Sequence, residues 1–152
     1  MRVSRLGHTG LTVADMERSL AFYAGILGFD VLQRRVIDQP WLAQLIGMDA
    51  AVVDAVDLAV PGTDQVLQLF RFSVPSTEPV SPSMSAPGSV HIAFIVHGMA
   101  DLLGRLAEGG VAWLAPPVVI TSGANAGGSL VCVRDPDGVV VEFYEAPGPP
   151  MA

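Results

Sequence analysis

Residues 89–96 read SVHIAFIV, an apolar stretch with a single histidine near its start. The stretch repeats the pattern of residues 7–13, GHTGLTV, which also carries one histidine. Alternating and β-branched apolar residues are typical of strands, so we expect both stretches to be β-strands. Two such strands with His8 and His91 in equivalent places predict two copies of one unit, whose imidazoles meet.

The repeat extends along the chain. After the strand at 6–13, Asp15 is a good N-cap for a helix that Gly28 ends. Further strands of the first copy are expected at 29–36, 52–60 and 65–72, with a short helical turn or loop at 39–47. The second copy repeats this order with a strand at 89–96, a helix from Met99 closed by Gly109 and Gly110, and strands at 111–114, 129–134 and 139–145.

These elements predict an α+β fold of two βαβββ modules in one chain. The modules are residues 5–73 and 89–146, joined by a Pro/Ser-rich linker at 74–88 within a single domain of residues 1–152. Two curved mixed sheets, each backed by a helix, are expected to form a cupped cavity.

The composition narrows the classes of function. The 152 residues are 51% hydrophobic with a net charge of −7, which argues against nucleic acid or an anionic membrane as a partner. No apolar run reaches the length that spans a bilayer, and no signal peptide is evident, so we expect a cytoplasmic protein. Cys132 is the one cysteine and is expected to be a buried structural thiol.

Four polar residues interrupt apolar strands at positions related by the repeat: His8, Gln68, His91 and Glu142. Strand alternation places each histidine on the face opposite the residues that pack on the helix. Singly, such residues are more often structural. As a set they supply two imidazoles, a carboxamide oxygen and a carboxylate, which suit one divalent ion: Mn, Fe(II), Co, Ni or Zn.

The two ends of the chain resemble the vicinal oxygen chelate superfamily, which includes glyoxalase I, methylmalonyl-CoA epimerase, extradiol dioxygenases and the fosfomycin and bleomycin resistance proteins. The motifs are His8-x-x-Leu11-x-Val13-x-Asp15 with Phe22-Tyr23 and Leu27-Gly28-Phe29, and Arg134-Asp135-Pro136-Asp137-Gly138 with Val141-Glu142. The resemblance implies metal ligands at His8, Gln68, His91 and Glu142, and a homodimer. Gln68, where glyoxalase I has Glu, makes this set most similar to that of methylmalonyl-CoA epimerase.

The resulting prediction is a metal-dependent epimerase or isomerase that acts on a small carbonyl or hydroxyketone substrate through a metal-chelated enolate. Glu142 is the candidate base, and Asp54 or Asp57 is the candidate second carboxylate. These two aspartates have opposite parity, so only one can face the cavity. The alternatives are an extradiol-type Fe(II) dioxygenase, for which His8, His91 and Glu142 would suffice, and a non-catalytic protein that binds a small molecule.

Overall fold

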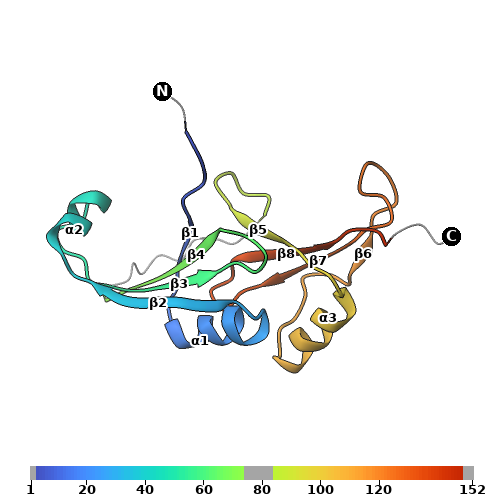
Figure 1. The fold of residues 1–152 in the computed structure, drawn as a ribbon, viewed down its shortest axis with the longest axis horizontal. Coiled ribbons are helices and arrows are strands. Elements are labelled where there is room, and N and C mark those ends of the chain that lie inside the picture. The colour runs from blue at the N-terminus through green and yellow to red at the C-terminus, as the bar shows by residue number, and fades with distance from the viewer. Residues whose placement is uncertain (1–2, 74–83, 149–152) are drawn as a thin grey trace. The chain divides into compact units, whose positions relative to one another are not determined.

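The computed structural model describes residues 3–73 and 84–148, which form two compact units. Residues 3–73 belong to the first unit and residues 84–148 to the second. Most of the expected linker, residues 74–83, lies outside the described residues. Figure 1 shows the chain coloured from blue at the N-terminus to red at the C-terminus.

Each unit contains one four-stranded mixed sheet. In the first, the strands β1 (Thr9–Thr12), β2 (Asp30–Ile37), β3 (Val53–Ala59) and β4 (Val66–Phe72) lie in the order β1-β4-β3-β2. In the second, β5 (His91–Ile95), β6 (Val118–Val119), β7 (Ser129–Arg134) and β8 (Val140–Glu145) lie in the order β5-β8-β7-β6. The first and last strands of each unit pair in parallel and the other pairs are antiparallel. The predicted α+β fold with two βαβββ modules is therefore confirmed.

One helix lies against a face of each sheet (Figure 1). In the first unit α1 (Met16–Leu20) begins at Asp15, whose carboxylate accepts a hydrogen bond from the backbone N–H of Arg18. In the second unit α3 (Met99–Glu108) begins after Gly98. There the side chain of Glu145, at the end of β8, accepts hydrogen bonds from the first N–H groups of the helix. These acceptors satisfy donors that have no partner inside a helix, which is why the helices start where they do.

The first helix changes its winding partway along. After α1 the chain continues as a π-helical segment, η1 (Ala21–Ile26), in which the backbone N–H of Leu27 donates to the carbonyl of Phe22, five residues earlier. The wider turn leaves both Phe22 and Tyr23 buried and stacks their rings edge to face, 4.9 Å apart. Gly28 (φ 78°) follows this segment, as Gly110 (φ 70°) follows α3, because both helices end in the left-handed conformation that glycine adopts easily.

The core of each unit lies between its helix and its sheet. In the first unit, alternate residues of β3 and β4 such as Val56, Leu58, Leu67 and Leu69 are fully or almost fully buried. In the second, Val133, Val141 and Phe143 of the sheet and Leu106 of α3 are buried in the same way. The strands therefore present one apolar face to the helix, and the opposite face is left to carry other side chains.

Two elements differ from the sequence-based expectation. The segment expected to be a short helical turn or loop is a regular helix, α2 (Pro40–Ile46), which lies beyond the ends of β2 and β3 (Figure 1). The strand expected at residues 111–114 is reduced to a single bridge between Trp113 and Val133. Pro116 and Pro117, which follow after Ala115, lack the N–H groups that a ladder needs and prevent it from continuing. Within the described ranges, no helix is long and apolar enough to cross a membrane.

Candidate functional site

The first pair of predicted site residues, His8 and Gln68, lies on one face of the first sheet. Gln68 is opposite Gly10 in the parallel pairing of β1 with β4, and His8 comes just before β1. A Cβ atom placed on Gly10 would lie 3.9 Å from the His8 ring and 2.9 Å from the Phe70 ring, so both rings occupy the face to which Gly10 would point. Phe70 meets the imidazole edge to face, with ring centroids 6.5 Å apart.

The second pair, His91 and Glu142, repeats this register in the second sheet. Ala93 is opposite Glu142 in the parallel pairing of β5 with β8. In both units, therefore, the oxygen donor on the last strand is opposite the residue two positions after the histidine. Because side chains alternate along a strand, each histidine and its oxygen donor are on the same side of their sheet.

Asp57 lies beside Gln68 at the centre of a polar cluster on the same face of the first sheet. It is directly opposite Gln68 in β4 and opposite Gln33 in β2. The Nε2 atom of Gln68 donates to Oδ1 of Asp57 at 2.9 Å, and the Nε2 atom of Gln33 donates to Oδ2 at 2.6 Å. Nη1 of Arg35 completes the cluster with an ion pair to Oδ2 at 2.9 Å.

The cluster keeps Asp57 ionised. Asp57 is only 6% exposed, and burial alone would raise the pKa of its carboxyl, because a charge is costly away from water. The contacts from Arg35, Gln33 and Gln68 outweigh burial, and the pKa of Asp57 lies below its ordinary value. The Asp57 carboxylate accepts hydrogen bonds and has no proton to give, so it is poorly suited to act as a general acid.

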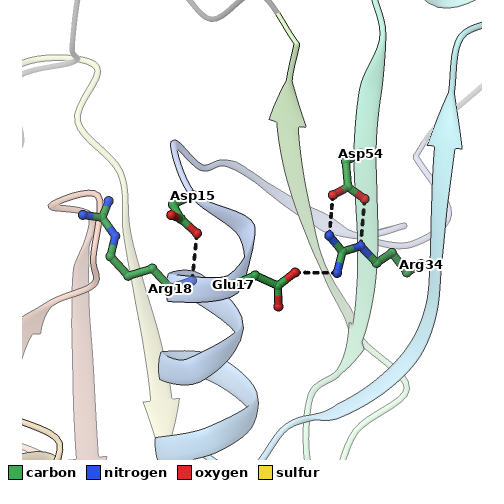
Figure 2. A network of polar contacts seen from close by, with 5 residues as sticks. All are labelled: Asp15, Glu17, Arg18, Arg34 and Asp54. Carbon is green, nitrogen blue, oxygen red and sulfur yellow. Dashed lines mark hydrogen bonds and ion pairs between the residues drawn. The ribbon is translucent and has the colours of Figure 1, made fainter.

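The structure does not bring Asp54 to this face. Asp54 lies on the opposite face of the sheet, where both carboxylate oxygens accept hydrogen bonds from Arg34, at 3.0 and 2.7 Å. Figure 2 shows that Arg34 also reaches Glu17 on α1, at 2.7 Å. Of the two aspartates proposed from parity, Asp57 therefore shares the face of Gln68. Asp54 instead pairs with Arg34, whose guanidinium also contacts Glu17 on the helix that covers the sheet.

The position equivalent to Asp57 in the second unit is Cys132. Cys132 is directly opposite Glu142, as Asp57 is opposite Gln68. Its side chain is partly rather than fully buried, in contrast to the expectation of a buried thiol. Burial, together with the negative charge of Glu142, raises the pKa of the Cys132 thiol, so the thiol stays protonated.

Gln33 and Arg35 are members of the cluster that the sequence did not single out. Strand parity would have found them only if the irregularity in β2 were known, because the pairing of β2 with β3 shifts between Val31 and Gln33. Within residues 3–73 and 84–148, no group of three or more His, Cys, Asp and Glu side chains forms a cluster that could hold a metal ion. Each unit taken alone offers one histidine and one oxygen donor at the predicted ligand positions.

Residues 5–143 match the family model of the Glyoxalase/Bleomycin resistance protein/Dioxygenase superfamily. The chain therefore belongs to this superfamily, as its end motifs indicated.

Individual relatives show the range of the superfamily. The chain is 27% identical to a 2-epi-5-epi-valiolone epimerase from an Actinomyces species, over 92% of this chain and 78% of the relative. It is 30% identical to a lactoylglutathione lyase from Salmonella typhimurium, over 93% of both chains. The crystal structure of a glyoxalase family protein from Bacillus cereus superposes with a TM-score of 0.84 at 19% identity, over 97% of both chains, which supports the fold.

Proposed function

We propose that the protein is a divalent-metal-dependent epimerase or isomerase that acts on a small hydroxyketone or related carbonyl compound. The proposed metal ligands are His8, Gln68, His91 and Glu142. The observation that supports them is the repeated register, in which each unit presents a histidine and an oxygen donor in the same relation on one face of its sheet.

The donor set fits such an ion. Two neutral imidazoles, one carboxamide oxygen and one carboxylate form a mixed nitrogen and oxygen set that suits Mn, Fe(II), Co, Ni or Zn. The contacts of Gln68 agree with this role: its nitrogen donates to Asp57, and among the described residues its oxygen accepts no hydrogen bond. Four protein ligands also leave room on a six-coordinate ion for substrate oxygens.

A bound divalent ion would supply Lewis acidity toward a carbonyl oxygen of the substrate. Glu142 is the proposed base: it takes the proton from the carbon next to the carbonyl, and the electron pair of the broken C–H bond moves toward the carbonyl oxygen. Return of a proton from solvent to the other face of the same carbon gives the epimer. No oxidant is needed, because substrate and product contain the same atoms.

Two observations support a small substrate. The chain has only 8 Lys and Arg residues against 15 Asp and Glu residues, a charge balance that is unfavourable for binding the phosphates of a CoA thioester. The name of the Actinomyces relative describes epimerisation of a ketone, 2-epi-5-epi-valiolone, which makes this compound the first probe to test.

The first experiment is metal analysis of protein purified without chelator. We expect one equivalent of a divalent transition metal in the wild type and its loss in His91→Ala. His97→Ala is the matched control, because this exposed histidine follows the same strand by two residues and is not a proposed ligand. Unchanged metal content in His91→Ala would contradict the ligand assignment, and absence of metal from the wild type would favour a binding protein.

The second experiment is NMR of the ketone probe incubated with the metal-loaded protein in D2O. One deuterium incorporated at the carbon next to the carbonyl, together with appearance of the epimer, is the expected result. Oxygen uptake with a catechol, in the absence of exchange, would instead support the dioxygenase alternative.

A further inference from the structure

A carboxamide differs from a carboxylate in having only one end that binds metal. The oxygen of a glutamine side chain is an acceptor with lone pairs, whereas its NH2 group is a double donor. A glutamine ligand therefore needs a neighbour that selects which end faces the ion, a role that outer contacts of metal ligands commonly have.

Gln68 has such a neighbour in Asp57. The Nε2 atom of Gln68 donates to Oδ1 of Asp57 at 2.9 Å, and the two residues are directly opposite each other on adjacent strands. An ionised carboxylate accepts and does not donate, so it can pair with the amide nitrogen but not with the amide oxygen. The contact therefore turns the Gln68 oxygen away from Asp57.

Asp57 is itself held on its other side. Its Oδ2 atom accepts the hydrogen bond from Gln33 at 2.6 Å and forms the ion pair with Arg35 at 2.9 Å, and the side chain is 8% exposed. Both partners come from β2, on the far side of β3 from Gln68. With one oxygen for Gln68 and the other for β2, the carboxylate has little freedom to rotate.

The second unit lacks this arrangement at the equivalent position, where Cys132 is opposite Glu142. The difference follows the chemistry of the two donors: a carboxylate has two equivalent oxygens, and either can face an ion. The unit with the carboxamide has an orienting carboxylate, and the unit with the carboxylate has a thiol.

We propose that Asp57 is a positioning residue, which holds the Gln68 carboxamide with its oxygen available to the metal ion. This inference rests on the proposed metal-binding function and assigns Asp57 no contact with the substrate. It replaces the role of second acid or base for which Asp57 was a candidate.

Calorimetric titration of metal-free protein with Mn2+ or Co2+ tests the proposal. In Asp57→Asn one carboxylate oxygen becomes a donor, so the amide of Gln68 loses its fixed orientation, and we expect metal affinity to fall by about 10- to 100-fold. Cys132→Ser is the matched control at the equivalent position and should bind metal as the wild type does.

A substitution of the ligand itself gives a sharper test. Counting ligands alone, Gln68→Glu should bind a cation more tightly, because it adds a negative charge. A carboxylate has two equivalent oxygens, however, and needs no neighbour to select one of them. If Asp57 acts by orienting Gln68, adding Asp57→Asn to Gln68→Glu should change affinity by less than about threefold, whereas the same change lowers it by about 10- to 100-fold when Gln68 is present.

Each outcome bears on one proposal or both. Wild-type affinity in Asp57→Asn, or an equal loss of affinity from Asp57→Asn in the wild-type and Gln68→Glu backgrounds, overturns the positioning role. If His91→Ala still abolishes binding in that case, the proposed metal site stands. Absence of binding in the wild type overturns both. Should Asp57→Asn fail to fold, as judged by circular dichroism, the same comparison with Asp57→Glu, which keeps the charge but displaces the carboxylate by one methylene, decides the question.

Discussion

Replacing Asp54 by Asn tests whether the Asp54 carboxylate has a structural role or a catalytic one. Asp54 pairs with Arg34 through both oxygens, at 3.0 and 2.7 Å, and its side chain is 20% exposed. The hydrogen bonds to Asp54, followed by the contact with Glu17, raise the pKa of Arg34, which is therefore permanently charged. We expect Asp54→Asn to lower stability and to leave metal binding and turnover unchanged.

The magnitude follows from exposure. Hydrogen bonds to charged groups contribute about 1.5–3 kcal/mol when protected from water, and exposed ion pairs contribute about 0.2–1 kcal/mol. The Arg34 side chain is 46% exposed, so screening lowers the contribution, whereas the two-pronged geometry retains part of it. We therefore expect a loss of about 1 kcal/mol, which corresponds to about 2–4 °C in Tm for a chain of this size.

The assay is thermal unfolding at low and high salt, paired with the deuterium-exchange assay. Glu17→Gln is the matched control, because Glu17 contacts the same guanidinium from a side chain that is 73% exposed and should change stability by less than about 0.5 kcal/mol. High salt should reduce the effect of both variants. A Tm equal to that of the wild type, combined with a tenfold or greater loss of turnover, would refute the structural assignment of Asp54.

Three further predictions concern the second unit. The hydrogen bonds from the start of α3 lower the pKa of Glu145 below its ordinary value of 4.5, so this contribution to stability is complete above pH 4.5 and is lost as the pH falls through the lowered pKa. Glu145→Gln should flatten the acid side of a plot of Tm against pH; an unchanged slope would contradict this. Leu106→Ala removes a side chain that is 0% exposed and should cost about 2–5 kcal/mol in urea unfolding, with a smaller loss arguing that the core refills the space. Gly128→Ala places a Cβ 2.7 Å from the ring of Tyr144 and should cost about 1–3 kcal/mol, whereas the control Gly104→Ala, in α3 with no atom within 4 Å, should be neutral or stabilising.

Local signals explain why the fold could be predicted from the sequence. Asp15 and the glycines after both helices mark the helix ends, and their roles depend only on nearby backbone atoms. The internal repeat added the long-range pairing, because two copies of one unit fold in the same way. Membership of the superfamily followed from the motifs at both ends and is confirmed by the family model.

The polar cluster around Asp57 depends on long-range register, which the sequence does not display. Parity alone left Asp54 and Asp57 as equal candidates, because it says that two residues differ in face without saying which face each takes. Gln33 and Arg35 could not be predicted either. The pairing of β2 with β3 shifts between Val31 and Gln33, so the face of each later residue of β2 cannot be found by simple alternation from the start of the strand.

The π-helical segment Ala21–Ile26 bears on how the two halves of the chain have diverged. Gly28 comes twelve positions after Met16, and Gly110 comes eleven positions after the equivalent Met99, so the first half carries one residue more between corresponding landmarks. If the extra residue were added to a regular α-helix, every residue after it would be rotated by about 100° around the helix axis. A π turn instead contains one more residue than an α turn, so it takes up the extra residue locally. A length change inside a helix can thus be accommodated by its winding, and both helices are still followed by a glycine with positive φ, Gly28 in the first half and Gly110 in the second.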